Sequence, residues 1–122
     1  MRRVEEDTDA LAALFSELPV AQVSAPSEFA QKYHWYLNTV RNNVERNWRP
    51  PTEDTRLAVT VNFVINKDGS VSGLAVAQSS GDGSLDRLAL RAVQLATFPQ
   101  LPPGFSGDKL DINFTLRPRR RS

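Results

Sequence analysis

Residues 58–76 predict a β-hairpin, and this hairpin restricts how the rest of the chain can pack. Every second position of its first strand is β-branched or aromatic, as in a strand with one buried face: Val59, Val61, Phe63 and Ile65. Asn-Lys-Asp-Gly follows at 66–69, where Gly69 can adopt the positive φ that a tight turn needs. The alternation across 71–76 is poor, so we expect a bulge or an irregular edge near Gly73.

One amphipathic helix is predicted on each side of the hairpin, because apolar residues recur at spacings of three and four. The first helix covers about residues 27–48, with its stripe at Phe29, Tyr33, Tyr36, Leu37, Val40, Val44 and Trp48. The stripe of the second consists of Leu85, Leu88, Ala89, Ala92, Val93 and Ala96. Asp82 or Ser84 is a suitable N-cap for the second helix, and prolines follow both helices.

The alternation is cleanest in the last apolar segment, which consists of Leu110, Asp111, Ile112, Asn113, Phe114, Thr115 and Leu116. The second helix returns the chain to its start, so the second and third strands run in the same direction and the first lies antiparallel between them. We therefore predict an α+β fold of topology α-β-β-α-β. Its three-stranded antiparallel sheet has the order 2-1-3, with both helices packed on one face.

This order leaves the last strand at an edge of the sheet. A regular edge strand exposes a row of unpaired N–H and C=O groups. An extended segment of a partner can pair with such an edge, with main-chain hydrogen bonds giving affinity and alternate side chains giving specificity. We predict a partner-binding site at Leu110, Asp111, Ile112, Asn113, Phe114, Thr115 and Leu116.

The length of 122 residues indicates one domain. We expect residues 1–28 to be a spacer with a short helix, residues 29–118 to be the folded domain, and residues 119–122 to be a basic tail. No apolar run approaches the roughly 20 residues that span a bilayer, and acidic residues follow the start at once, unlike a signal peptide. If the chain belongs to an envelope protein, we expect its membrane anchor to lie upstream.

The sequence carries few residues suited to catalysis, so we predict that the chain is not an enzyme and uses no cofactor or metal. Without cysteine there is no thiol nucleophile or zinc-thiolate site. His34 is the single histidine, and we expect it at the surface. The alternative is a small enzyme that uses His34 with the loop at 79–84. That loop could also bind an anion at the start of a helix, although a tight turn with an N-cap explains it as well.

The charge pattern argues against nucleic acid as a partner. The net charge is +1, so no strong field surrounds the chain, and the arginines at 117–121 have no aromatic residues among them. Trp35 lies off the main helical stripe and is the better candidate for an exposed aromatic, whereas Trp48 is expected in the core. We expect a monomer or a weak dimer that pairs its own edge strands.

The ordered set of motifs from about residue 33 to residue 117 resembles the C-terminal domains of the TonB/TolA energy transducers. The first helix with its Trp-Arg-Pro-Pro end at 48–51 is similar to TolA domains, and the hairpin at 61–71 is similar to the whole family. The signature of the second helix lies in Ser79, Ser80, Gly81, Leu85, Asp86, Ala89, Leu90, Ala92, Val93, Phe98, Pro99, Leu101 and Pro102, and residues 110–114 match the closing strand.

The resemblance implies a periplasmic domain at the end of a longer protein anchored in the inner membrane. Such proteins couple the proton gradient, through a motor complex, to work at the outer membrane. For TonB-like members the partner is an outer-membrane transporter for siderophores or vitamins. For TolA-like members it is a periplasmic protein of the Tol system, and colicins and phage proteins use the same surface. Strand addition to the sheet is the expected mode of binding.

Two departures bear on the choice within the family. Residues 49–54 lack the Tyr-Pro motif of TonB members, which favours a TolA-like domain, as does the form of the first helix. The segments at 79–81 and 98–99 are closer to TonB. We place the chain in the family with a slight preference for the TolA side. The alternative is TonB-like energising of outer-membrane transporters.

Overall fold

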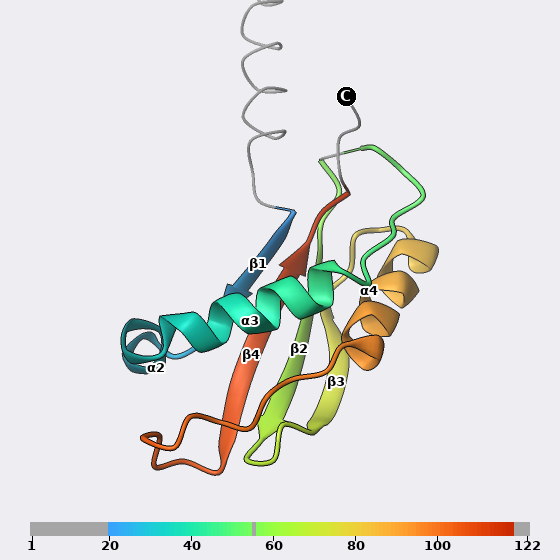
Figure 1. Ribbon diagram of the computed structural model, residues 1–122. Helices are drawn as coiled ribbons and strands as arrows, with labels where there is room; N and C mark the ends of the chain where they lie inside the picture. The colour runs from blue at the N-terminus through green and yellow to red at the C-terminus, as the bar shows by residue number, and fades with distance from the viewer. Residues whose placement is uncertain (1–19, 55, 119–122) are drawn as a thin grey trace, which may run out of the picture.

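The computed structural model describes residues 20–54 and 56–118. The elements follow the order β1 (Ala21–Ser24), α2 (Ser27–Lys32), α3 (His34–Glu45), β2 (Val59–Asn66), β3 (Val71–Gln78), α4 (Gly83–Leu95) and β4 (Lys109–Leu116). In this part of the chain one sheet has four strands in the order β1-β4-β2-β3, and every neighbouring pair is antiparallel. Helices α3 and α4 lie side by side across one face of the sheet (Figure 1).

The α+β class and the central position of β2 are confirmed, but the predicted sheet lacked one strand. The order β3-β2-β4 is the 2-1-3 arrangement expected from sequence, and β1 adds to it on the outer side of β4. The prediction of a spacer over residues 1–28 is therefore wrong for Ala21–Ser24, which form β1. The short helix expected further upstream lies outside the described residues.

The first predicted helix is divided in two at Tyr33, whose backbone (φ −124°, ψ 42°) is not helical. Backbone hydrogen bonds connect the two helices across the break. Tyr33 donates its N–H to the carbonyl of Phe29 at 2.8 Å, and its own carbonyl accepts from the N–H of Tyr36 at 2.9 Å. The Tyr33 ring packs against Phe29, with the two ring centroids 5.0 Å apart. The prediction of one helix over 27–48 was therefore wrong at this point.

The hairpin and the second helix form as the sequence predicts. Gly69 has a φ of 92°, and its N–H bonds to the carbonyl of Asn66 at 2.9 Å. The register of β2 against β3 shifts between Asn62 and Val64, which places the expected irregularity next to Gly73. The N-cap of α4 is Asp82, whose side chain accepts hydrogen bonds from two backbone N–H groups of the first turn.

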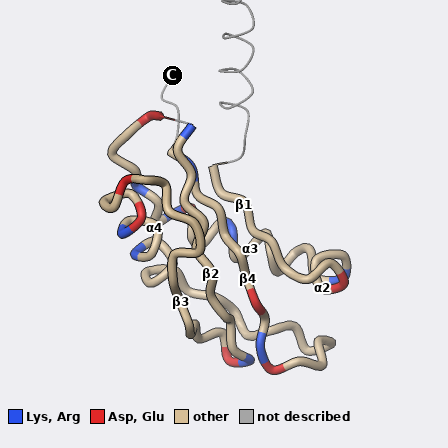
Figure 2. Tube along the Cα trace, turned by 180° about the vertical axis from the view of Figure 1, so that it is seen from behind, with Lys and Arg blue, Asp and Glu red and all other residues tan. Residues whose placement is uncertain are grey.

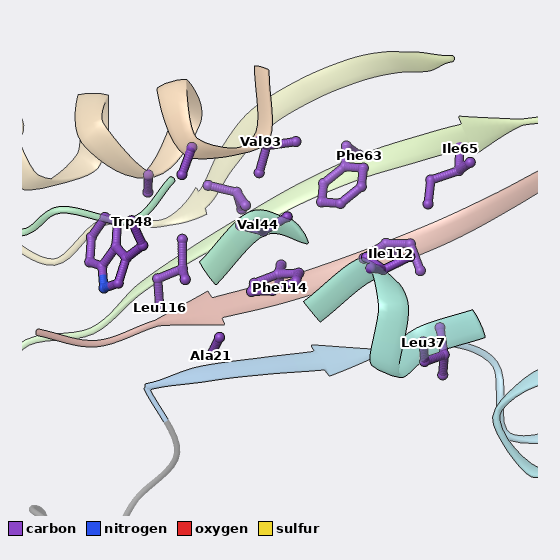
Figure 3. Packing of buried hydrophobic residues seen from close by; sticks show 14 of the residues in the cluster. Ala21, Leu37, Val44, Trp48, Phe63, Ile65, Val93, Ile112, Phe114 and Leu116 are labelled. Carbon is purple, nitrogen blue, oxygen red and sulfur yellow. The ribbon is translucent and has the colours of Figure 1, made fainter. Parts of the chain in front are cut away.

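The core lies between the sheet and the two long helices (Figure 3). The strands contribute alternate residues, all buried: Val59, Val61, Phe63, Ile65, Leu110, Ile112, Phe114 and Leu116. Trp48 is fully buried, as expected, and its indole N–H donates to the carbonyl of Arg117 at 2.7 Å. Tyr36 is also fully buried and donates its hydroxyl to the carbonyl of Pro99 at 2.6 Å. These two bonds fix α3 and its C-terminal extension to both ends of the segment that contains β4.

The opposite face of the sheet is open and mostly uncharged. Strands β1, β2 and β3 contain no charged residue, whereas β4 begins with Lys109 and Asp111. Figure 2 shows this face, with charge on the sheet gathered at the beginning of β4 and at the nearby hairpin turn. Polar side chains link the strands across it, as in the 3.0 Å contact between the hydroxyls of Thr60 and Thr115.

Candidate functional site: a half-open edge of β4

The outer edge of β4 is covered along only half of its length. Strand β1 pairs with residues 113–116, with Ser24 opposite Asn113 and Ala21 opposite Leu116. Among the described residues, no strand pairs with this side of residues 109–112, although β2 pairs with all of β4 on the other side. The expectation that β4 is an uncovered edge strand is therefore wrong for its second half, because it omitted β1.

The direction of the backbone groups follows from one hydrogen bond. Arg117 donates its N–H to the carbonyl of Val20 at 2.8 Å. In an antiparallel pair the residues that exchange hydrogen bonds alternate along each strand. The N–H and C=O groups of Asp111 and Lys109 therefore point in the same direction as those of Arg117, beyond the end of β1. These groups can form hydrogen bonds with an extended segment, as the outward groups of residues 113–116 do with β1.

Pro26 explains why β1 stops where it does. Continuing the register by two residues beyond Ser24 would place Pro26 opposite Asp111. A proline has no N–H to donate to the carbonyl of Asp111, and Pro26 (φ −51°, ψ 137°) is already the N-cap of α2. The local sequence thus leaves half of the edge without a partner strand from this part of the chain.

The seven residues predicted as the site divide between the two faces of the sheet. The apolar members Leu110, Ile112, Phe114 and Leu116 are buried in the core, and Asp111, Asn113 and Thr115 lie on the open face. The amide of Asn62 donates to the Asn113 side chain at 3.0 Å, and Thr115 contacts Thr60. Strand β4 therefore offers a partner its main-chain edge more than its apolar side chains.

A groove of about 270 Å³ lies beside the open half of this edge. We define the aromatic groove by its lining residues, which are Pro26, Glu28, Phe29, Lys32, Tyr33, Gly104, Phe105, Ser106, Lys109, Leu110 and Asp111. Phe29 and Phe105 meet edge to face with ring centroids 5.1 Å apart, and Tyr33 and Phe105 do so at 6.4 Å. Helix α2 and the loop before β4 thus lie on the same side of the edge (Figure 1).

Two glycines allow these rings to take their places. A Cβ at Gly104 would lie 2.7 Å from the hydroxyl of Tyr33, and one at Gly107 would lie 2.6 Å from the Phe105 ring. Sequence reasoning missed the groove, since it assigned Phe29 and Tyr33 to one core stripe and treated the proline-rich stretch only as a stiff connection. The signal that could have indicated it is Pro-Pro-Gly-Phe at 102–105 followed by Gly107.

The other edge of the sheet, on β3, is irregular. Its register against β2 shifts between Thr60 and Val61 and again between Asn62 and Val64. Each bulge interrupts the ladder and increases the local twist, which discourages pairing with another strand. The open half of β4 is the more regular edge.

The residues considered for catalysis do not come together. His34 is exposed, and its Nε2 lies 3.5 Å from the side-chain nitrogen of Asn38. It lies at the beginning of α3, next to β1, whereas the loop at 79–84 lies before α4 (Figure 1). In residues 20–54 and 56–118, no group of three or more His, Asp or Glu side chains could hold a metal ion. Trp35 is 53% exposed, as the sequence predicted. The end of the arginine tail lies outside the described residues.

The loop at 79–84 is bonded to its own helix. The Asp86 carboxylate accepts from the N–H of Ser80 at 2.9 Å, from its hydroxyl at 2.7 Å, and from the hydroxyl of Ser79. Burial raises the pKa of the Asp86 carboxyl, but the hydrogen bonds from Ser79 and Ser80 outweigh this effect and hold the pKa below its usual value. Because Asp86 already occupies these donors, the tight-turn interpretation of the loop is the better one.

Comparison with known proteins gives a consistent result. The model of the family described as TonB C terminal matches residues 33–116. Protein TonB of Haemophilus influenzae is 35% identical over 103 residues, which cover 80% of this chain and 38% of that protein. The solution structure of the Helicobacter pylori TonB C-terminal domain, residues 179–285, shares the fold with a TM-score of 0.56. It is 24% identical and covers 81% of this chain and 98% of its own.

These matches define a small α+β interaction domain of a non-enzymatic family of energy transducers. The chain belongs to the TonB C-terminal family. The prediction that it is not an enzyme is confirmed by this membership. The matching family model and the Haemophilus influenzae relative are both described as TonB, which favours the TonB side of the resemblance over the TolA side.

The chain spans about two fifths of the length of the curated relative that it matches. The end of the domain at residue 118 stays a prediction, whereas its predicted start at residue 29 leaves out β1, which belongs to the sheet. Within the described ranges, none of the helices is long and apolar enough to cross a membrane.

Proposed function

We propose that this chain is the periplasmic partner-binding domain of a TonB-type protein anchored in the inner membrane. The whole protein transmits proton-motive energy, received from a motor complex, to an outer-membrane transporter. Membership of the family and the similarity to a TonB protein support this role. A Tol-system partner, a colicin or a phage protein is the alternative use of the same surface.

We further propose that the partner adds an extended segment to the outer edge of β4. The observation that carries this proposal is the half-open edge, where the backbone groups of Asp111 and Lys109 point away from β2 beyond the end of β1. Each main-chain hydrogen bond that forms there contributes about 0.5–1.5 kcal/mol net. A segment longer than about four residues meets β1 at Asn113 and has to displace it to continue along β4.

An amide-shift NMR titration tests both parts of the proposal. The probes are two synthetic peptides, one from the periplasm-facing N-terminal segment of an outer-membrane transporter and one from the N-terminus of a periplasmic Tol protein. Shifts concentrated at residues 109–116, with β1 affected by the longer peptides, support strand addition, and the peptide that binds identifies the partner class. Peptide binding that shifts other amides but leaves the amide signals of β4 and β1 unchanged would refute strand addition at this edge.

Two variants of one residue separate the main chain from the side chain. Asp111→Pro removes the outward N–H without touching a bond to β2, whereas Asp111→Ala keeps that N–H and removes only the carboxylate. We expect the proline variant to bind the transporter peptide roughly two- to tenfold more weakly, because one hydrogen bond is lost. The alanine variant is expected to retain most of the binding, because its main-chain N–H is still present. If the proline variant does not fold, N-methylation of single peptide residues makes the same test.

A further inference from the structure

A strand added to the open half of β4 has a defined orientation. If it continues the register of β1, its residues opposite Asp111 and Lys109 exchange hydrogen bonds, and the residue between them lies opposite Leu110. The Leu110 side chain points to the helix face of the sheet and is 2% exposed. Because directly opposed residues of an antiparallel pair point to the same face, the partner side chain opposite Leu110 also points there. The aromatic groove lies at this position, with Leu110 in its lining.

The walls of the aromatic groove are suited to one large apolar side chain. Phe29, Tyr33 and Phe105 already contact one another at ring distances of 5.0–6.4 Å. A further ring can extend this cluster in an edge-to-face or offset arrangement, which aromatic groups prefer over a face-to-face sandwich. The volume of about 270 Å³ lies just below the roughly 300–1,000 Å³ of pockets for small-molecule ligands, so a single side chain is the better fit.

The charges around the aromatic groove balance. Glu28 and Asp111 supply two negative charges, and Lys32 and Lys109 supply two positive charges. A charged side chain in the groove would meet a repelling group whichever sign it carried, and it would lose its hydration against the rings. The rim therefore favours an uncharged occupant.

We propose that the aromatic groove is a specificity pocket for a partner protein, and that it receives one aromatic side chain from an extended segment paired with Asp111 and Lys109. The neighbours of that side chain in the segment lie opposite Asp111 and Lys109 and point to the open face, where polar residues are tolerated. The recognised sequence is therefore an aromatic residue between two polar ones. This proposal rests on strand addition to β4 and adds the side chain that the site selects.

Selection from a random decapeptide display library on the immobilised domain tests the proposal without a known partner. We expect the selected peptides to share an aromatic residue flanked on both sides by polar ones. A synthetic peptide of the selected sequence is then titrated into the labelled domain. The expected shifts lie at Phe29, Tyr33, Phe105 and residues 109–111. Replacing the aromatic residue of the peptide by alanine is expected to weaken binding about tenfold or more.

Variants of the groove complete the test. Phe105→Ala removes one wall, and Gly104→Ala displaces the Tyr33 ring, since its new Cβ would lie 2.7 Å from the hydroxyl. Both are expected to weaken binding of the aromatic peptide and to leave binding of its alanine counterpart nearly unchanged. Leu95→Ala is the matched control, because Leu95 is a large exposed residue, 54% accessible, on α4 away from the groove. Well-dispersed amide spectra establish that each variant is folded.

The outcomes separate the pocket from strand addition itself. Peptides that pair with β4 but show no aromatic preference, or that bind the two groove variants as well as the parent, overturn the pocket and leave strand addition in place. Failure to select any peptide that shifts β4 overturns both. Selected aromatic peptides whose shifts lie elsewhere also overturn the pocket.

Discussion

Tyr36→Phe is expected to change the pH dependence of stability as well as its magnitude. The Tyr36 side chain is fully buried, and its hydroxyl donates a 2.6 Å hydrogen bond to the carbonyl of Pro99. This bond connects α3 to the segment that leads to the aromatic groove and to β4. Phenylalanine keeps the ring and removes only the hydroxyl, so the change isolates the hydrogen bond and the ionisable proton.

At neutral pH the variant is expected to be less stable by about 1 kcal/mol, the usual net contribution of one intramolecular hydrogen bond. For a domain of this size that is a measurable fraction of the free energy of unfolding, which is about 5–15 kcal/mol. The loss is expected in the urea midpoint, with little change in the slope because the surface exposed on unfolding stays the same.

At alkaline pH the order is expected to reverse. Burial raises the pKa of Tyr36 from 10.0 to about 12, so the folded state holds this proton more tightly than the unfolded state. The stability that Tyr36 contributes is fully present below pH 10 and is lost as the pH rises through 12. By linkage the parent loses about 1.4 kcal/mol from this group by pH 11. The variant has no such proton, so the two stabilities are expected to meet near pH 11.

The assay is urea unfolding followed by circular dichroism at pH 7, 9, 10, 10.5 and 11. Groups common to both proteins cancel in the difference between them. A difference that stays at about 1 kcal/mol across this range would show that Tyr36 has an ordinary pKa in the folded protein. A difference near zero at pH 7 would show that water replaces the hydrogen bond without loss.

Three further changes have distinct expected results in the same assay. Gly69→Ala should destabilise the fold much more than Gly81→Ala, since both glycines have a φ near 90° but only a Cβ at Gly69 meets backbone, 2.4 Å from the carbonyl of Phe98. Equal losses would contradict the steric argument. Trp48→Phe should cost about 1–3 kcal/mol through a lost hydrogen bond and a cavity. A negligible cost would mean that the end of β4 is not fixed there. The lowered pKa of Asp86 contributes stability at neutral pH, and this contribution disappears as the pH falls through the folded-state pKa. Asp86→Asn should therefore lose less stability than the parent on acidification. An acid transition identical to that of the parent would refute this role.

Local patterns predicted the parts of the fold that depend on neighbours in sequence. The hairpin turn requires a positive φ at Gly69, and the register shift next to Gly73 follows from a strand that loses its alternation. The Asp82 cap was one of two candidates that the sequence offered, and the structure distinguishes them by hydrogen bonds to the first turn.

The two errors arose where tertiary contacts decide the local structure. Residues 21–24 are Ala-Gln-Val-Ser, a short segment with little strand propensity, and they form β1 only because β4 offers a ladder. The break at Tyr33 lies inside an unbroken apolar stripe, so no local signal marks it. At the non-helical residue Tyr33, the ring contacts Phe29 of the same segment and Phe105. Phe105 belongs to a loop about 70 residues later in the chain.

These errors also explain what was missed at the site. An uncovered β4 follows directly from a sheet that lacks β1, so the site was placed along all seven residues. With β1 present, the open part begins where Pro26 turns the chain away from the sheet. The aromatic groove depends on the same turn together with the loop at 102–107, so the Pro-Pro-Gly-Phe signal at 102–105 does not place the groove by itself.

The entry of the chain into the sheet determines how tension would pass through the molecule. Val20 leads directly into β1, and the β1–β4 hydrogen bonds lie perpendicular to the strands. A pull on Val20 along the axis of β1 stretches these bonds in shear, all at once, whereas a pull across the axis would unzip them singly. A partner segment on residues 109–112 lies in line with β1 on the same edge. Strand β4 would then connect two short strands, β1 on residues 113–116 and the partner segment on residues 109–112. The hydrogen bonds of both would be loaded in shear.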